Sequence, residues 1–148
     1  MSVADGRVSA MDQRISFITL AVRDLGASRS FYVDGLGWEP CVDVLGEVLM
    51  FKVADKVVLS LWDETAFESE VGPISRGGGV PPVTLAHNCA TPQGVDRVLE
   101  SARLAGAEPV ADAQQRDWGG YSGYFGDPDG YRWEVAFNPG EIGQEVLP

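Results

Sequence analysis

The side chains that most often hold metal ions or act as nucleophiles are scarce in this sequence. Its 148 residues include one histidine, His87, and two cysteines, Cys41 and Cys89. These cannot build a His-rich zinc or iron centre, a Cys-rich zinc site or an iron–sulfur cluster within one chain. A chain of this length needs no disulfide framework, so we interpret both cysteines as small buried thiols. Any metal site would therefore need carboxylates or a second subunit.

The charge balance limits the partners that the chain can have. It carries 22 Asp and Glu residues against 11 Lys and Arg, a formal net charge of −11 at pH 7. A surface of this sign repels phosphate backbones and anionic membranes, and no basic patch interrupts it. No apolar run approaches the roughly 20 residues of a membrane-spanning helix, and the N-terminus lacks the layout of a signal peptide. We therefore expect a globular, cytoplasmic protein that binds neither nucleic acid nor membranes.

The same order of elements is predicted twice along the chain. Strand-like patterns and an N-cap at Asp24 predict, in the first half, a strand over 15–22, a helix over 25–33, and strands over 38–44, 47–53 and 56–62. Thr91 followed by Pro92 predicts, in the second half, a strand over 83–89, a helix that ends before Gly106, and strands over 108–111, 120–125 and 131–137. Each half therefore has the order β-α-β-β-β.

These elements divide the chain into segments. We expect a flexible N-terminal arm over 1–13, a first module over 14–63, a linker over 64–82, a second module over 83–139 and a C-terminal tail over 140–148. The acidic residues at the start of the linker are interpreted as a solvated connector. A module of this size buries little core by itself, so the two modules should pack together as one domain.

Two motifs within this duplicated plan resemble those of a known family. They are the run Phe31-Tyr32-Val33-Asp34-Gly35-Leu36-Gly37-Trp38 and the run from Tyr124 to Val135, which contains Asp127-Pro128-Asp129-Gly130. Over residues 15–139 the chain resembles the vicinal oxygen chelate superfamily, which includes glyoxalase I, extradiol dioxygenases, fosfomycin resistance enzymes and bleomycin resistance proteins. The resemblance implies an α+β fold in which tandem βαβββ modules form a cup-shaped half barrel with helices on the outside. It also implies a homodimer, since relatives often complete their pockets across two chains.

The resemblance further implies four metal-ligand positions, one on the first and one on the last strand of each module. Carried over by spacing, they are Phe17, Ser60, Thr84 and Glu134 in this sequence. An alternative alignment of Thr19-Leu20-Ala21 with Thr84-Leu85-Ala86 moves the third position to Pro82. A phenyl ring cannot coordinate a metal, and neutral hydroxyls are poor ligands without several carboxylates around them. The inherited metal site is therefore expected to be degenerate, with no metal and no other cofactor bound.

Alternation of side chains along the strands predicts what lines the cup. His87 falls on the opposite side of its strand from Thr84, so we interpret it as packed and hydrogen-bonded under the helix layer; a general base is the alternative. Glu134 is the candidate catalytic acid or base, although Arg132 on the same face offers it a structural ion pair instead. The glycine-rich aromatic segment 117–124 either stacks on a ligand or closes the core. The expected ligand-binding residues are Phe17, Thr19, Ser60, Trp62, Thr84, Asn88, Trp118, Tyr121, Tyr124, Arg132 and Glu134.

Three functional hypotheses follow from these residues. The first is a metal-free relative that binds a small organic molecule in the cup, as bleomycin resistance proteins do, with a cationic ligand favoured by the charge of −11. The second is a glyoxalase-type lyase or isomerase in which Glu134 acts as acid or base. The third is a purely structural or interaction module, which an aromatic-lined cup disfavours. At this point the sequence leaves open whether the chain is an enzyme.

Overall fold

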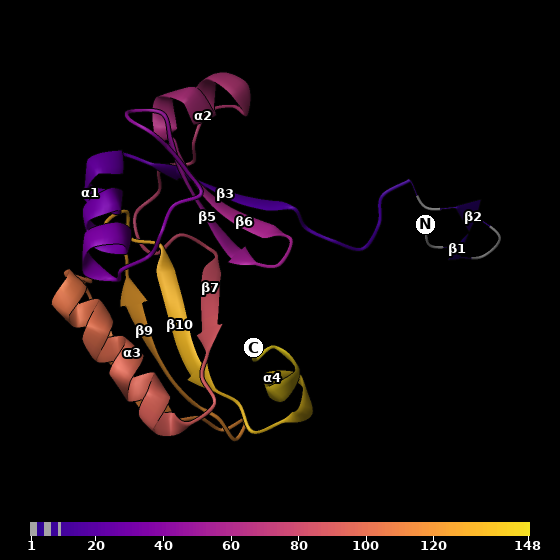
Figure 1. Cartoon of the computed structure of the whole chain (residues 1–148), viewed down its shortest axis with the longest axis vertical. Helices are drawn as coiled ribbons and strands as arrows, with labels where there is room; N and C mark the ends of the chain where they lie inside the picture. Colours follow the sequence, from indigo (N-terminus) through magenta and orange to yellow (C-terminus); the bar gives the residue numbers. More distant parts are fainter. Residues whose placement is uncertain (1–2, 5–6, 9) are drawn as a thin grey trace.

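Two modules of the same topology make up the body of the protein (Figure 1). The computed structural model describes residues 3–4, 7–8 and 10–148. The first module comprises β3 (Phe17–Val22), α1 (Leu25–Arg29), η1 (Ser30–Gly35), β4 (Val42–Val44), β5 (Val48–Ala54) and β6 (Val57–Asp63). The second comprises β7 (Thr84–Asn88), α3 (Pro92–Ala105), β8 (Val110–Gln115), β9 (Tyr121–Gly126) and β10 (Arg132–Phe137). The predicted α+β class and the tandem βαβββ order are confirmed.

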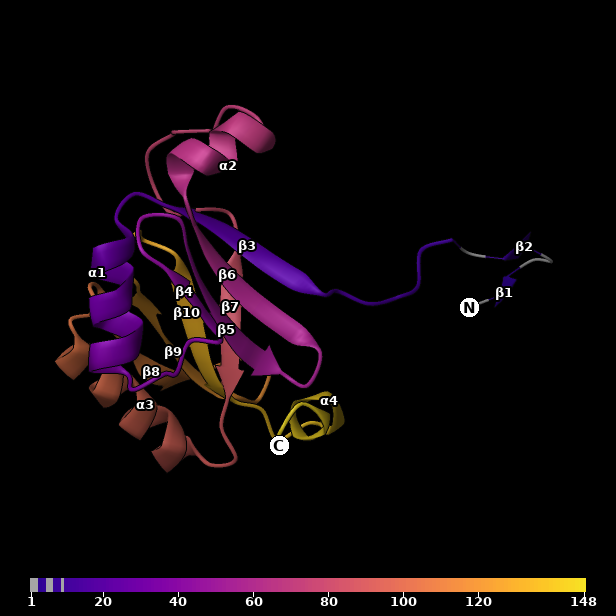
Figure 2. The ribbon, with the colours of Figure 1, turned by 45° about the horizontal axis from the view of Figure 1, so that its top comes forward.

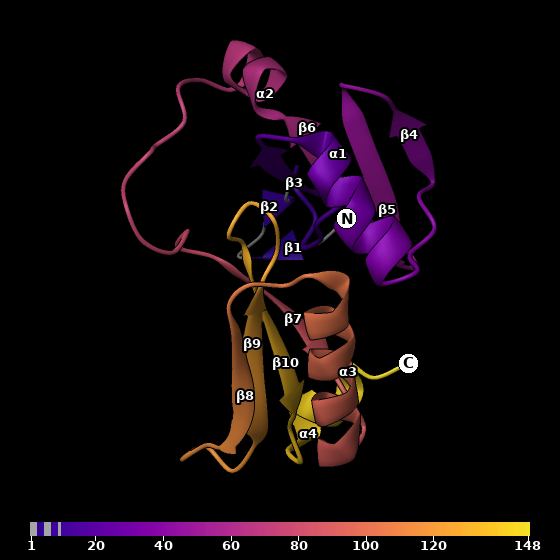
Figure 3. The ribbon, with the colours of Figure 1, turned by 90° about the vertical axis from the view of Figure 1, so that its left-hand side faces the viewer.

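Each module folds into an open, four-stranded mixed sheet. The strand orders, β3-β6-β5-β4 and β7-β10-β9-β8, are equivalent. In each sheet the first strand runs parallel to the last, and the other neighbouring strands are antiparallel. A parallel pair needs a crossover connection, which the helix of each module begins. Figure 3 shows the two sheets as separate lobes, linked by the long segment that precedes β7.

Local sequence sets where the two crossover helices begin. The Asp24 carboxylate accepts the backbone N–H groups of Gly26 and Ala27, and Thr91 caps α3 in the same way through its hydroxyl. Both caps agree with the prediction. The first helix does not stay α-helical, because η1 continues it as a π-helix. The wider turn lets the adjacent Phe31 and Tyr32 both point into the core, where they are 3% and 0% exposed.

A single hydrophobic core joins the modules. Its aromatic rings come from both, and Phe31 of η1 lies 5.9 Å from Phe125 of β9 between ring centroids. Helix α3 also contacts η1, where a Cβ at Gly35 would lie only 2.5 Å from that of Ala105. Figures 1 and 2 show α1 and α3 on the same side of the body. The modules therefore share one interior.

A buried chain of hydrogen bonds crosses this interior. The Tyr32 hydroxyl donates to the Asp127 carboxylate (2.8 Å), and the indole N–H of Trp133 donates to the Tyr32 hydroxyl (2.9 Å). The other Asp127 oxygen accepts the backbone N–H groups of Asp129 and Tyr131. Burial raises the pKa of Asp127; burial and then the Asp127 charge raise the pKa of Tyr32 well above its usual value. These hydrogen bonds fix the turn 127–130 of the second module against the first module.

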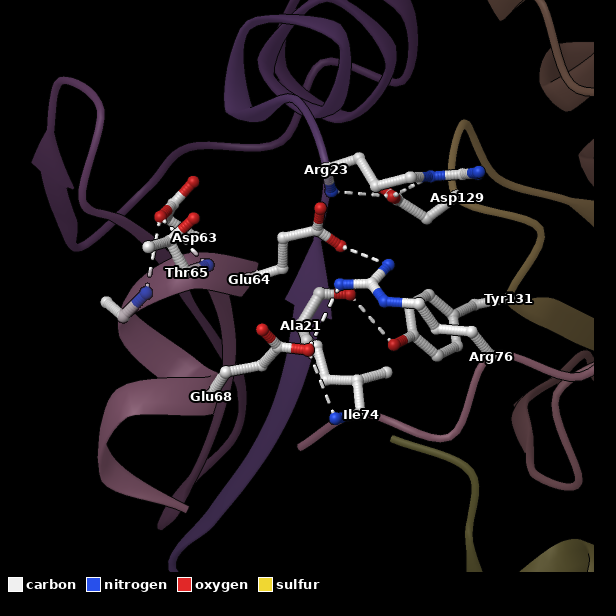
Figure 4. Close-up of polar contacts among 11 residues, drawn as sticks. Ala21, Arg23, Asp63, Glu64, Thr65, Glu68, Ile74, Arg76, Asp129 and Tyr131 are labelled. Carbon is white, nitrogen blue, oxygen red and sulfur yellow. Dashed lines mark hydrogen bonds and ion pairs between the residues drawn. The ribbon is translucent and has the colours of Figure 1, made fainter. Parts of the chain in front are cut away.

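The same turn is also held to the end of β3 at the surface (Figure 4). The Tyr131 hydroxyl donates to the carbonyl oxygen of Ala21 (2.8 Å). Asp129 accepts the backbone N–H of Arg23 (2.8 Å) and, more weakly, its guanidinium (3.4 Å). The Asp-Pro-Asp-Gly sequence predicts the turn, and in the structure this turn is hydrogen-bonded to the first module.

The predicted linker 64–82 begins with a helix that its composition does not indicate. Asp63 caps α2 (Glu64–Glu70) by accepting two backbone N–H groups. The guanidinium of Arg76 then pairs with Glu64 (3.1 Å) and Glu68 (3.2 Å), as Figure 4 shows. The acidic residues interpreted as a solvated connector therefore hold the returning chain against α2.

The chain ends also contain short elements. Among residues 1–13, β1 (Val3–Ala4) and β2 (Arg7–Val8) pair with each other well away from the modules (Figures 1 and 2). The remaining part of that predicted arm at residues 1–2, 5–6 and 9 lies outside the described residues. The tail contains α4 (Glu141–Glu145). Within the described ranges, no helix is long and apolar enough to cross a membrane.

The two thiols differ in their surroundings. Cys89 directly follows β7 and is half-buried. Cys41 directly precedes β4, a strand at the edge of its sheet, and is exposed. The interpretation of both as buried thiols is therefore wrong for Cys41. An edge strand has a neighbour on one side only, so residues beside it are not covered by the sheet.

Candidate functional site

Alternation along the strands gives each sheet a helix-facing side and an outer face. Core residues such as Leu20, Leu61 and Val135 lie on the helix-facing sides. The opposite sides face away from the crossover helices and correspond to the predicted cup lining. We call them the outer faces; they carry Ser60 in the first sheet and Glu134 in the second. By the same register the outer faces also carry the predicted residues Phe17, Thr19, Trp62, Thr84, Asn88, Tyr124 and Arg132.

The strand register also identifies equivalent positions in the two modules. Phe17 lies two residues before the β3 partner of Ser60, and Thr84 lies two residues before the β7 partner of Glu134. Phe17 and Thr84 are therefore equivalent, as are Ser60 and Glu134. This register selects Thr84 over the alternative Pro82 as the third position that the family resemblance indicates.

These four positions do not provide the donors that a divalent metal needs. Phe17 has no donor atom and is 55% exposed, Ser60 is buried, and Thr84 is exposed at the sheet edge. Glu134 is the one carboxylate among them. Across the part of the chain that the structure describes, no three His, Cys, Asp or Glu side chains gather as a metal site requires. One carboxylate and two neutral hydroxyls do not fit such an ion.

Tyr124 and Glu134 form a hydrogen-bonded pair on the outer face of the second module. They lie directly opposite each other on β9 and β10, and the Tyr124 hydroxyl donates to Glu134 Oε2 at 2.9 Å. Both side chains are half-buried. Burial and then the bond to Glu134 raise the pKa of Tyr124, so this hydroxyl remains a donor at neutral pH. Glu134 Oε1 accepts no hydrogen bond from any described residue and is available to a ligand.

Arg116 lies beside this pair. Its guanidinium donates from Nε to the Ser122 hydroxyl (3.0 Å) and from Nη2 to the Ser122 carbonyl oxygen (2.8 Å). These bonds hold it 5.9 Å from the centroid of the Tyr124 ring. Arg116 was not predicted from the sequence. It lies beyond the predicted strand 108–111, and alternation assigns a face only to residues within a strand. We call Arg116, Tyr124 and Glu134 the outer-face cluster.

Arg132 does not form the ion pair with Glu134 that their shared strand face suggested. Its Nη1 donates instead to the carbonyl oxygen of Gly130 at 2.8 Å, at the start of its own strand. Residues two apart on a strand share a face but lie roughly 7 Å apart, so a shared face does not ensure contact. Glu134 is therefore paired with Tyr124 rather than with an arginine.

In the first module the chain itself covers part of the outer face. Helix α2 contacts β3 and β6, and its Phe67 packs edge to face on Trp62 with ring centroids 6.1 Å apart. Ser60 is only 3% exposed. Thr19 and Phe17, on the edge strand β3, remain exposed. The predicted cup residues of the first module are thus divided between a covered group and an open edge.

Two predicted aromatic residues lie away from the outer-face cluster. Tyr121 is on the helix-facing side, and its hydroxyl donates to Asp96 of α3 at 2.7 Å. Trp118 is 53% exposed and lies over Gly120, where a Cβ would be 1.8 Å from the indole ring. Of the aromatic residues in 117–124, Tyr124 is the one that belongs to the outer-face cluster. The segment therefore contributes Tyr121 to the helix-facing side and Tyr124 to the outer face.

His87 lies on the helix-facing side, as predicted, but it is exposed rather than packed. It lines a cavity between the modules together with Leu85 and Trp133. No residue that the structure describes forms a hydrogen bond with its imidazole. The expected hydrogen bond is therefore not formed among the described residues, and the imidazole lines this cavity from β7, an edge strand.

Comparisons with known proteins identify relatives of the whole duplicated unit. The family model described as Glyoxalase/Bleomycin resistance protein/Dioxygenase superfamily matches residues 14–135. A glyoxalase-related enzyme from Fulvimarina pelagi superposes with a TM-score of 0.76 at 34% identity, covering 86% of this chain and 89% of that one. A glyoxalase/bleomycin resistance protein/dioxygenase from Nocardioides gives 0.70 at 27% identity, over 90% and 92% of the two chains. A lactoylglutathione lyase from Agrobacterium tumefaciens gives 0.65 at 26% identity, over 86% and 96%. The comparison with curated proteins gives no match.

The family match covers both modules, in agreement with the shared core and the equivalent sheet registers. These relatives are named for different activities, so the fold does not decide the reaction. The chain belongs to the Glyoxalase/Bleomycin resistance protein/Dioxygenase superfamily.

Proposed function

We propose that the protein binds a small organic molecule at the outer-face cluster of the second module. The observation that carries this proposal is the half-buried Tyr124–Glu134 pair, in which Glu134 Oε1 has no partner among the described residues. This accessible carboxylate oxygen can accept a hydrogen bond from a ligand that supplies an N–H or O–H group. The adjacent ring of Tyr124 adds an apolar surface.

The charges around the cluster favour a ligand with donor and acceptor groups. Glu134 Oε1 accepts from an ammonium or amide group of the ligand. Arg116, held by Ser122, offers its remaining N–H groups to an acceptor. The net charge of −11 adds a weak long-range attraction for cations. A cationic molecule that also carries a carbonyl or hydroxyl group meets all of these conditions.

The pocket is proposed to be completed by a second copy of the chain. On the edge strands β3 and β7, the outer-face residues Phe17, Thr19, Thr84 and Ala86 are exposed. An exposed phenylalanine on an uncovered sheet face is typical of a surface that association buries. Phe17→Asp should therefore convert a dimer into a monomer in analytical ultracentrifugation. A wild type that sediments as a monomer at high micromolar concentration would contradict this part of the proposal.

Binding at this cluster is proposed to need no divalent metal. Three of the four positions indicated by the family resemblance hold Phe17, Ser60 and Thr84, and we interpret the metal site as degenerate. Elemental analysis of protein purified without chelators should find no stoichiometric divalent metal. One tightly bound ion per chain would overturn this interpretation.

A pair of matched variants tests the binding site. Thermal shift with bleomycin and a panel of cationic aromatic amines identifies ligands, because a molecule that binds only the native state raises the melting temperature. Calorimetry then compares the wild type with Glu134→Gln and with the control Glu141→Gln, an exposed glutamate of α4. Removing a charge-assisted bond should weaken cationic ligands about tenfold or more at Glu134→Gln. An unchanged affinity in that variant, or equal weakening in both, would reject the site.

A second candidate function, a glyoxalase-type lyase or isomerase, is favoured by the same pair. Tyr124 holds one oxygen of Glu134 and leaves Oε1 free to take a proton from a bound substrate. The lactoylglutathione lyase from Agrobacterium tumefaciens shares the fold at 26% identity. Turnover of the methylglyoxal–glutathione hemithioacetal should then fall at least about 100-fold in Glu134→Gln. An equal rate in wild type and variant would dismiss this function.

A further inference from the structure

A cavity of about 460 Å³ lies between the two modules, separate from the outer-face cluster. The largest side chains of its apolar wall are Ile18, Trp38, Phe51, Leu59, Leu85 and Trp133. Ile18 and Leu85 directly follow Phe17 and Thr84, so they point to the opposite sides of β3 and β7. Most of this wall therefore lies on the helix-facing sides of the two sheets, whereas Lys52 and Ala86 reach the cavity from the outer faces.

The aromatic wall of this cavity is built to receive a flat ring. Trp38 packs edge to face against Phe51, with centroids 5.3 Å apart and planes at 77°. It packs in the same way against Trp133, at 5.7 Å and 88°. Rings fixed at right angles present both faces and edges, and a further aromatic ring can pack against either. The volume lies within the range of pockets that hold small organic ligands, about 300–1,000 Å³.

Three ionisable side chains complete the lining, and two of them are donors. Lys52 and His87 are exposed, and neither forms a hydrogen bond or an ion pair with any other described residue. An ammonium and an imidazole N–H are both hydrogen-bond donors to acidic groups. Glu39 also lines the cavity, and its carboxylate disfavours a second anionic group on the ligand. The lining thus suits an aromatic body with a single negative charge.

We propose that this cavity is a second binding site, specific for a flat aromatic acid with one anionic group. The aromatic body packs between Trp38 and Leu85, and the acidic group accepts hydrogen bonds from Lys52 and His87. His87 also lines an adjoining cavity of about 220 Å³, which extends past Trp38 toward α3 and gives room for a substituent. This site does not depend on what the outer-face cluster binds.

Two exposed valines provide a matched test of the location. Val53 lines the cavity and is 44% exposed, whereas Val44 on β4 is 41% exposed and lies outside the lining. Calorimetry with 2-naphthoate on the full chain should show one site in the wild type and in Val44→Trp. Val53→Trp fills the cavity mouth without enlarging a buried residue, and should weaken naphthoate at least tenfold. No saturable binding by the wild type, or equal affinity in both variants, would overturn the proposal.

The charge requirement is tested by comparing 2-naphthoate with the neutral 2-naphthamide. Lys52→Ala should weaken naphthoate about tenfold, the loss of one charge-assisted hydrogen bond, and leave naphthamide nearly unchanged. Lys56→Ala, at the exposed turn between β5 and β6, is the matched control and should change neither. Equal affinity of the wild type for the two compounds would overturn the specificity for acids. Loss of naphthoate binding in Glu134→Gln would instead place it on the outer face and reject the second site.

Discussion

The two modules share a backbone plan but differ in what their outer faces hold. In the first module Ser60 is buried, and α2 packs Phe67 onto Trp62. In the second, Glu134 occupies the position equivalent to Ser60 and pairs with Tyr124 in a half-open setting. Duplication therefore supplies the scaffold twice, and only the second copy carries a carboxylate at this position.

The segments that follow the last strands explain part of this difference. After β6 the chain forms α2 at once, which contacts β3 and β6 and is joined to the returning chain by Arg76 through Glu64 and Glu68. After β10 it continues to α4, and the outer-face cluster stays half-buried. The first module has therefore become the structural half and the second the proposed binding half.

The largest effect is expected at the buried link between the halves. Asp127→Ala removes the acceptor of the Tyr32 hydroxyl and of two backbone N–H groups. Leaving buried donors unpaired should lower the free energy of unfolding by about 3 kcal/mol. Urea denaturation measures it, with the exposed Asp117→Ala as a control that should stay within about 0.5 kcal/mol of wild type. Two separate unfolding transitions in the variant would show that the link, rather than the shared core, makes the modules cooperative.

A smaller loss is expected where α2 covers the first outer face. Trp62→Ala removes a half-buried ring that packs on Phe67, and should cost about 2 kcal/mol of stability. Trp118→Ala, which removes a more exposed ring of the same size, should cost less. Reversal of this order in denaturant titrations would mean that the first outer face is not the structural half. Ligand affinity at the outer-face cluster should be the same in both variants.

A pH titration tests whether Tyr32 stays neutral between the halves. Its pKa in the folded state is raised well above the usual 10, by burial and then by the Asp127 charge. Its contribution to stability is therefore complete below pH 10 and is lost as pH rises from there toward the folded-state pKa, because the unfolded chain ionises first. Above pH 10 the wild type should lose up to about 1.4 kcal/mol per pH unit more than Tyr32→Phe. Parallel stability curves for the two proteins would contradict this assignment.

The smallest effect is expected at the surface pairs of Arg76. Arg76→Ala breaks its exposed contacts with Glu64 and Glu68, and such pairs contribute little because solvent screens them. The melting temperature should fall slightly at low salt and match the wild type at high salt. A large loss that persists at high salt would show that the linker, beyond its charges, holds the first module together.

Local signals in the sequence were enough to predict much of the fold. Asp24 and Thr91 cap the crossover helices as expected, because a cap depends on a side chain and the backbone two or three residues away. The Asp127–Gly130 turn and the alternation of β10 are local in the same sense. Alternation also put Glu134 on the cup side of its strand, but it assigned no face to Tyr124 and could not show that the two side chains pair.

What the sequence could not predict depends on contacts between distant segments. Alternation suggested an ion pair between Arg132 and Glu134, but the Arg132 guanidinium donates to the Gly130 carbonyl oxygen instead. Arg116, which lies outside the predicted strands, is the arginine next to the Tyr124 ring. Tyr121 faces α3 because strand register, rather than composition, decides its side. Helix α2 escaped prediction because its short amphipathic stretch is stabilised by packing on Trp62 and by Arg76.

The duplicated βαβββ plan, the family and the side of the strand on which Glu134 lies could be predicted from the sequence, because they depend on periodicity and local motifs. The folded structure was needed to show that Tyr124 is the partner of Glu134, that His87 is exposed beside an intermodule cavity, and that Asp127 links the modules through Tyr32. Each of these depends on how two sheets pack across one core, and packing joins residues whose separation along the chain carries no periodic signal.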